Sequence, residues 1–122
     1  MSKTFFSEKE QSCNCCGQGK LSGDTLIRLN FARLIAGIPF VLNCACRCAK
    51  HNKEVGGVEK SAHLIKADNT ANAVDIQCTN SSARFIILKA LLDAGFKRVG
   101  IYKTFIHADD DPNLPSEVIW HD

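Results

Sequence analysis

The sequence lacks long apolar runs and has little excess of charge of either sign. No segment approaches the run of about twenty apolar residues that a membrane-spanning helix needs. The formal net charge is only +2 and the basic residues are scattered, which argues against a nucleic-acid surface. The first ten residues carry charges where a secretory signal needs an uninterrupted apolar core, so we expect cytoplasmic synthesis. The sequence contains neither an internal repeat nor a low-complexity segment.

The composition is typical of a soluble globular protein. Of the 122 residues, 45% are hydrophobic and 23% are charged. A chain of this length buries a hydrophobic core without a second domain. We therefore expect one domain over residues 1–122, acting as a monomer.

Cysteine is unusually frequent, with seven residues. Because no secretory signal is visible, free thiols or metal ligands are favoured over a disulfide framework. Six of the cysteines fall in two groups, C-x-C-C at 13–16 and C-x-C-x-C at 44–48. Neither whole pattern matches the paired, two-residue-spaced knuckles of zinc ribbons. Free cysteines are therefore the favoured interpretation, and a structural zinc site is the alternative.

Two helices are indicated by capping residues and apolar spacing. The first covers 22–37, between the cap-forming Ser22 and Gly37, and its wide apolar arc predicts deep burial. The second covers 83–94, with Ser81 or Ser82 as its cap and Gly95 beyond its end. Its expected core stripe comprises Phe85, Leu88, Leu91 and Leu92.

Alternating or continuous apolar residues predict strands within 38–48, 72–78, 97–102, 104–109 and 118–120, the last an edge strand. Residues 1–20 and 49–60 are expected to be loops. The two-residue period of a strand places Phe105, His107 and Asp109 on one face of 104–109, and Asp75 on the face of 72–78 opposite Val74 and Ile76.

Two histidines and one carboxylate, His63, Asp75 and His107, are a sufficient ligand set for a catalytic zinc with one position open for water. Arg47, at the end of a predicted strand, can point into such a site. The residues alone leave another interpretation open, because an isolated histidine is more often structural than a ligand.

A series of short motifs, in order from Phe5 to Trp120, resembles the M15 family of zinc D-Ala-D-Ala carboxypeptidases and related phage endolysins. The resemblance implies the hedgehog/DD-peptidase fold, an α+β architecture in which a small antiparallel sheet carries the site and two main helices pack against it. The motifs are Asn43-Cys-Ala-Cys-Arg47, His51-Asn52, Val55-Gly-Gly57, Ser61-Ala-His63, Ala73-Val-Asp75-Ile, Gly95-Phe96, Gly100-Ile-Tyr and Phe105-Ile-His107-Ala-Asp109.

The resemblance also implies roles for individual residues. His63, Asp75 and His107 would bind zinc, Arg47 would face the substrate, and Ser61 would support the site. The implied reaction is metal-assisted hydrolysis of peptide bonds at D-amino acids in bacterial peptidoglycan stem peptides or cross-links. A phage-type lysin would reach the cell wall after release by a separate membrane-permeabilising partner.

The general base is a further expectation. Many family members carry an acidic residue three positions before the last histidine, where this chain has Thr104. We therefore predict Asp109 as the base, with His51 as the weaker candidate. Eleven residues separate His63 from Asp75, so the intervening loop should bulge outward.

Two other functions stay open. One is a non-catalytic zinc- or peptidoglycan-binding module on the same fold. The other makes the cysteines a structural zinc site and the histidines incidental.

Overall fold

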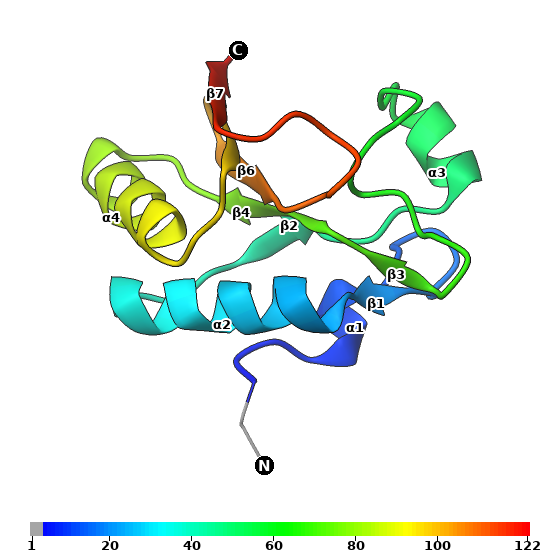
Figure 1. Ribbon diagram of the computed structural model, residues 1–122, viewed down its shortest axis with the longest axis horizontal. Helices are drawn as coiled ribbons and strands as arrows, with labels where there is room; N and C mark the ends of the chain where they lie inside the picture. Colours follow the sequence, from blue (N-terminus) through cyan, green and yellow to red (C-terminus); the bar gives the residue numbers. More distant parts are fainter. Residues whose placement is uncertain (1–3) are drawn as a thin grey trace.

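The computed structural model describes residues 4–122 and has the α+β architecture expected from the sequence. A mixed, mostly antiparallel sheet of five strands runs through the molecule in the order β2-β4-β6-β5-β7 (Figure 1). Only the pair β5 and β7 is parallel, and β7 is an edge strand as predicted. The strands are β2 (Leu42–Cys44), β4 (Ala73–Gln77), β6 (Phe105–Asp109), β5 (Arg98–Ile101) and β7 (Val118–His121).

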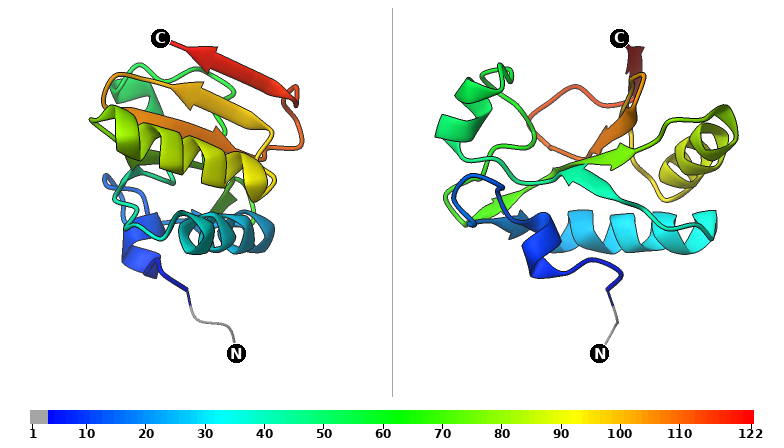
Figure 2. Two further views of the ribbon diagram at one scale, coloured as in Figure 1. Left: turned by 90° about the vertical axis from the view of Figure 1, so that its left-hand side faces the viewer. Right: turned by 180° about the vertical axis from the view of Figure 1, so that it is seen from behind.

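Two main helices, α2 (Gly23–Ala36) and α4 (Ser81–Asp93), pack together against the sheet. The short helix α3 (Ala49–Glu54) lies on the opposite side of the sheet from α4, as both views show (Figures 1 and 2). Ser22 caps α2, and Gly37 ends it in the left-handed conformation, as predicted. The cap of α4 is Asn80 rather than either predicted serine.

The apolar arc of α2 is less buried than its width suggested. Leu29 and Ala32 are buried, whereas Ile27 is 70% exposed and Phe31 52% exposed. The sheet and α4 cover only one side of this helix, so the adjoining apolar side faces outward.

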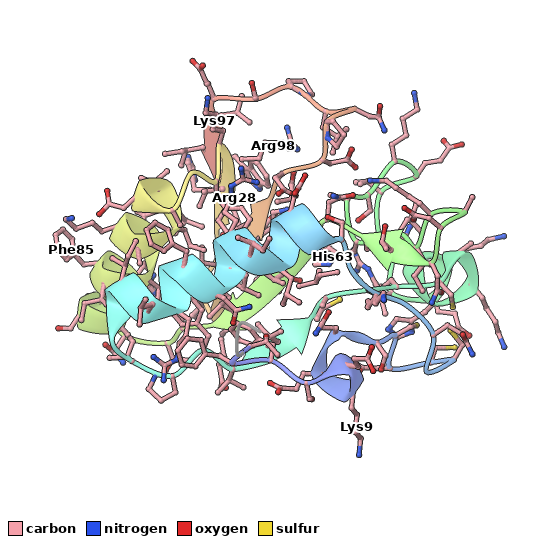
Figure 3. The ribbon with its side chains drawn as sticks, turned by 60° about the horizontal axis from the view of Figure 1, so that its bottom comes forward. Lys9, Arg28, His63, Phe85, Lys97 and Arg98 are labelled. Atoms are coloured by element: carbon pink, nitrogen blue, oxygen red, sulfur yellow. The ribbon has the colours of Figure 1, made fainter. Side chains whose placement is uncertain are left out.

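The predicted core stripe of α4 is partly wrong. Leu91 is buried, but Phe85 is 68% exposed and projects from the outer side of the helix (Figure 3). The residues that face the core are Ile87, Ala90 and Leu91. In a helix that is apolar nearly all round, the pattern does not tell which arc the sheet will cover.

The two segments expected to be loops contain short helices, α1 (Glu8–Gln11) and α3. A two-stranded parallel sheet also joins β1 (Lys20–Leu21) to β3 (Thr70–Ala71). The strand predicted over 38–48 is regular only in β2, although Arg47 adds a parallel bridge to Leu64.

The central strands have one apolar face and one polar face. Val74 and Ile76 of β4, with Ile106 and Ala108 of β6, enter the hydrophobic core beneath α2 and α4. The alternating positions turn Asp75, His107 and Asp109 to the other face, as the two-residue period predicted. Among residues 4–122, no helix is both long and apolar enough to cross a bilayer.

Candidate active site

The structure brings the three predicted ligands together around one carboxylate oxygen. Asp75 Oδ1 lies 3.1 Å from His63 Nε2 and 3.0 Å from His107 Nδ1. Asp75 and His107 face each other across the antiparallel pair β4 and β6, while His63 reaches them from the loop before Leu64. Figure 3 shows His63 in the interior of the molecule. Its side chain is only 3% exposed.

The other nitrogen of each imidazole is held by an acceptor. His63 Nδ1 lies 2.6 Å from the backbone carbonyl oxygen of Ala45. His107 Nε2 lies 2.7 Å from Oδ2 of Asp109. Each ring therefore has one nitrogen fixed by a backbone or carboxylate oxygen and one turned toward Asp75.

These contacts favour the charged forms of all three groups. Burial alone would lower the pKa of His63, but its hydrogen bond to Asp75, followed by that to Cys44, raises the pKa to about 9. Burial also opposes charge on His107, and its bonds to Asp109 and Asp75 raise its pKa. Although burial would raise the pKa of Asp75, hydrogen bonds from His107 and His63 lower it well below its usual range.

The segments that carry Arg47 and His63 are tied together by their backbones. The amide of Arg47 donates to the carbonyl of His63 at 2.7 Å, and the amide of Ile65 donates to the carbonyl of Arg47 at 3.0 Å. The Ser61 hydroxyl oxygen accepts from Arg47 Nη2 at 3.0 Å and from the His63 amide at 3.2 Å. Ser61 thus orients both predicted functional residues.

The long segment between His63 and Asp75 bulges away from the site, as expected. Its middle forms a turn in which the Lys66 amide donates to the Thr70 carbonyl and the Asn69 amide to the Lys66 carbonyl. The chain then pairs with β1 through β3 before it enters β4. The extra residues are therefore absorbed by the small parallel sheet and do not separate the ligands.

Asp109 is buried and both of its oxygens are engaged. Oδ2 faces His107, while Oδ1 accepts from Arg98 Nε at 2.8 Å and from the Asp111 amide at 3.2 Å. Its side chain is 1% exposed. Thr104 lies in the exposed turn before β6 and does not line the cleft, and neither does His51.

A cleft of about 670 Å³ opens over the imidazoles and is lined by Arg47. Arg47 Nε is buried without a hydrogen-bond partner, an unsatisfied donor of the kind that a ligand oxygen would complete. Other lining residues come from the loop after α3, from β6 and β7, and from the loops after β5 and β6: Gly57, Val58, Lys60, Tyr102, Phe105, Leu114 and Trp120.

The far wall of the cleft contains residues that the sequence did not identify. The Trp120 ring lies 5.4 Å from the His107 ring, and its Nε1 donates to the Tyr102 hydroxyl at 2.8 Å. Gly100 permits this arrangement, because a Cβ there would overlap the indole of Trp120. The guanidinium of Arg98 lies over the Trp120 ring, 5.2 Å from its centroid, and also lines the cleft. Pairing of β5 with β7 assembles this wall, and no local pattern reveals it.

Cys44 is a further donor beside the site. Its sulfur lies 3.7 Å from His63 Nδ1, and Cys44, His63 and Asp75 offer donor atoms within 4.8 Å of one another. The Nδ1 atom of His63 already faces the Ala45 carbonyl oxygen. The His107 ring, in contrast, contacts the same Asp75 oxygen as Nε2 of His63. His107 and Cys44 are thus the two candidates for a third ligand beside His63 and Asp75.

Comparison with known protein families agrees with this arrangement of residues. A family model described as Peptidase M15 matches residues 5–109. The chain belongs to the Peptidase M15 family. The match covers β4, β6 and all three histidine and aspartate positions of the site. A comparison with curated proteins finds no match.

M15 peptidases are zinc-dependent, and the donor set of this chain fits zinc. Four ligands at zinc–nitrogen and zinc–oxygen distances of about 2.0–2.2 Å in a tetrahedron lie roughly 3.4 Å apart. Here the two imidazole nitrogens lie 3.1 and 3.0 Å from the shared Asp75 oxygen. These two separations are close to those between neighbouring ligands of a tetrahedral zinc, so the donor set fits the ion.

Proposed function

We propose that this M15 family member is a zinc metallopeptidase that cuts peptide bonds at D-amino acids in bacterial peptidoglycan, as a stem-peptide carboxypeptidase or a cross-link endopeptidase. The observation that carries the proposal is the shared Asp75 oxygen, which faces one nitrogen of His63 and one of His107 at the base of a cleft. The fixed outer nitrogens of both rings support the ligand role. Family membership supports the substrate class.

The residues around the ligands would each do a separate part of the work. When bound, zinc lowers the pKa of a coordinated water toward neutrality and polarises the scissile carbonyl. Arg47 would hold a substrate carbonyl or carboxylate oxygen through its unsatisfied Nε. Ser61 would keep the guanidinium in place from the other side. The indole of Trp120 and the ring of Phe105 would exclude water from the far wall.

Asp109 is the residue to which the sequence assigned proton transfer. Its burial and its two engaged oxygens support a different role in this proposal, that of a positioning residue for His107. A carboxylate on the outer nitrogen fixes the tautomer and increases the basicity of a metal-binding imidazole.

The alternative function is a non-catalytic zinc- or peptidoglycan-binding module. One observation favours it: the only acidic residues lining the cleft in the described part of the chain are Asp75 and Asp109, and both are engaged with histidines. Such a module would bind zinc and cell-wall peptides through the same residues without cutting them.

Digestion of purified peptidoglycan separates the two functions. The zinc-loaded protein should release fragments whose masses identify the bond cut, and a carboxypeptidase would release single D-amino acids. His63→Ala should abolish release, because it removes the most buried ligand. Lys60→Gln, on the rim of the same cleft, is the matched control and should retain activity. Binding of peptidoglycan without any released fragment would establish the alternative.

A further inference from the structure

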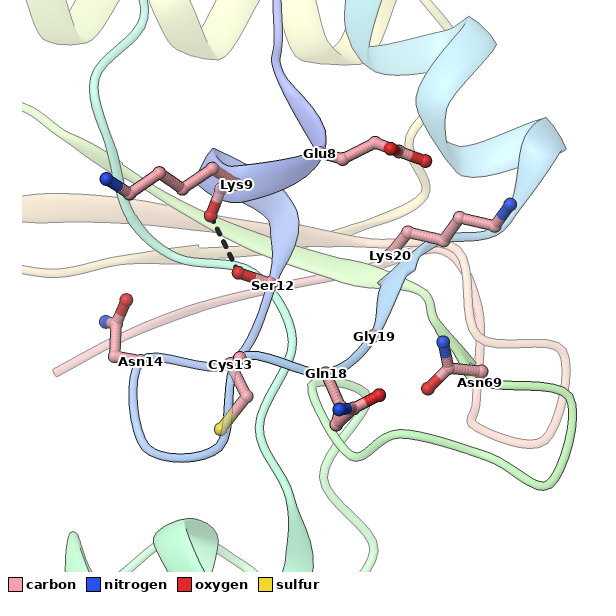
Figure 4. A pocket seen from close by; sticks show the side chains of 10 residues that line it. Glu8, Lys9, Ser12, Cys13, Asn14, Gln18, Gly19, Lys20 and Asn69 are labelled. Atoms are coloured by element: carbon pink, nitrogen blue, oxygen red, sulfur yellow. Dashed lines mark hydrogen bonds between the residues drawn. The ribbon is translucent and has the colours of Figure 1, made fainter.

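Three of the cysteines that the sequence left without a role, Cys13, Cys16 and Cys48, lie together at one place. The loop after α1 folds back on itself between Cys13 and Gln18, as Figure 4 shows. The Cys13 amide donates to the Gln18 carbonyl at 2.8 Å, and the Gly17 amide donates to the Cys13 carbonyl at 2.8 Å. Gly17 takes a left-handed conformation with φ of 72°, which favours glycine and closes the turn.

This loop meets the segment that enters α3. Cys13, Cys16 and Cys48 place their sulfur atoms within 4.8 Å of one another. Four sulfurs bound tetrahedrally to zinc at about 2.3 Å lie roughly 3.8 Å apart. The spacing of Cys13 and Cys16 is the two-residue spacing of a zinc knuckle, which the extra Cys15 conceals in the pattern C-x-C-C.

Backbone amides donate to two of these three sulfurs. Cys13 Sγ accepts from the amide of Cys48 at 3.3 Å and from that of Cys15 at 3.4 Å. Cys48 Sγ accepts from the amide of His51 at 3.4 Å. Hydrogen bonds to sulfur favour the ionised form that a metal needs.

We propose that Cys13, Cys15, Cys16 and Cys48 form a second, structural zinc site that is separate from the cleft. Cys15 supplies the fourth ligand, because its amide donates to Cys13 Sγ at 3.4 Å, which places its backbone beside the cluster, and its exposed thiol is free to turn inward. Donor atoms of His51 and Glu54 lie within 4.8 Å of that of Cys15, so His51 is the competing candidate for the fourth position. Four thiolates close the coordination sphere, which is the arrangement of structural rather than catalytic zinc.

The site would fasten the N-terminal loop to the segment that carries Arg47. Residues 14–18 are exposed, so the loop has little buried apolar surface to hold it. Arg47 lies directly before Cys48, and its position over the cleft depends on this segment. Metal binding would supply the missing stabilisation, because the binding free energy of a structural zinc adds to folding.

The test uses His63→Ala protein, so that the cleft does not contribute metal and the result is independent of the proposed peptidase activity. This protein should retain one equivalent of zinc by elemental analysis. Its cobalt-substituted form should show thiolate-to-cobalt charge-transfer absorption. Adding Cys48→Ser or Cys16→Ser should remove both signals, whereas adding Cys78→Ala should not, because Cys78 is a buried thiol outside the cluster. The proposal would be overturned if the His63→Ala protein is isolated without zinc and its cobalt-treated form shows no thiolate-to-cobalt absorption.

A second measurement does not depend on how the variants fold. Protein without cysteine substitutions is alkylated with and without a chelator, and the labelled peptides are identified by mass. Residues 13, 15, 16 and 48 should react several-fold faster after zinc is removed. Equal labelling of these four in both samples would overturn the site. A different result would overturn the choice of fourth ligand: zinc protects residues 13, 16 and 48 from alkylation but does not protect Cys15, and His51→Gln loses the zinc.

Discussion

Asp109 Oδ2 lies 2.7 Å from Nε2 of His107, on the side of the ring away from Asp75. The other oxygen of the same carboxylate accepts from Arg98 on the neighbouring strand, so that Arg98, Asp109, His107 and Asp75 form one continuous hydrogen-bonded series. A ligand oriented in this way is stiff and basic, which favours metal binding.

Asp109→Asn should therefore weaken zinc binding by about 10–100-fold. The amide retains the size of the carboxylate but places an NH2 group against Arg98 or His107, and removes the negative charge. Competition with a chromophoric chelator measures the affinity. Asp111→Asn is the control, because Asp111 is also buried but pairs with Lys66. Unchanged zinc affinity with hydrolysis lost would instead support Asp109 as the general base, the role that the sequence suggested.

His107→Ala and Cys44→Ser distinguish the two candidates for the third ligand. We expect His107→Ala to lose the cleft zinc and Cys44→Ser to keep it, because the Cys44 sulfur lies beside the already occupied Nδ1 of His63. Zinc is measured by elemental analysis in a Cys48→Ser background, so that zinc at the proposed cysteine site is not counted. Retention of zinc by His107→Ala and its loss from Cys44→Ser would replace the proposed ligand set.

Removal of zinc should make the stability of the protein depend on pH in a specific direction. In the metal-free protein the pKa of His63 is raised from 6.5 to about 9 by Asp75, with burial opposing the shift. The stabilisation is therefore complete below about pH 6.5 and is lost as the pH rises through about 9. The raised pKa of His107 acts in the same direction. Thermal melts of chelated protein should show a midpoint that falls across this window.

His63→Ala is the control for that experiment, because it lacks one of the two pairs and should show a smaller fall. Zinc binding near neutral pH should also release protons from both rings, since zinc takes their places beside Asp75. Titration calorimetry in buffers of different ionisation enthalpy counts these protons. Binding without proton release would mean that the histidines are already neutral in the metal-free protein.

Arg47→Lys should reduce kcat/KM by about 10–100-fold, corresponding to the loss of roughly 1.5–3 kcal/mol from a charge-assisted hydrogen bond. Lysine retains the charge, but its single nitrogen cannot occupy both the position of Nη2 beside Ser61 and that of Nε toward the substrate. Steady-state hydrolysis of a synthetic stem peptide measures the effect, and Lys60→Gln serves again as the rim control. An equal loss in both variants would indicate a general effect of positive charge at the cleft.

The sequence predicted the polar face of the sheet because strand alternation is local. The alternation in β4 and β6 determined the directions of Asp75 and His107, and the capping residues Ser22 and Gly37 determined the ends of α2. These features depend on neighbours within a few residues. The covered arc of α4 could not be predicted, because it depends on where α2 and the sheet lie.

The remaining parts of the site depend on distant pairings. Arg98 reaches Asp109 only because β5 lies beside β6, and Trp120 reaches His107 only because β7 lies beside β5. The family resemblance supplied the ligands but not these partners. The signal for the cysteine cluster was present in the two-residue spacing of Cys13 and Cys16, and Cys15 concealed it.

Anomalous diffraction at the zinc edge from crystals of the zinc-loaded protein tests the central claim most directly. We expect a peak about 2 Å from His63 Nε2, His107 Nδ1 and Asp75 Oδ1, the three atoms that already converge in the cleft. A cleft without such a peak, or a peak bonded to Cys44 Sγ with the His107 ring turned away, would contradict it.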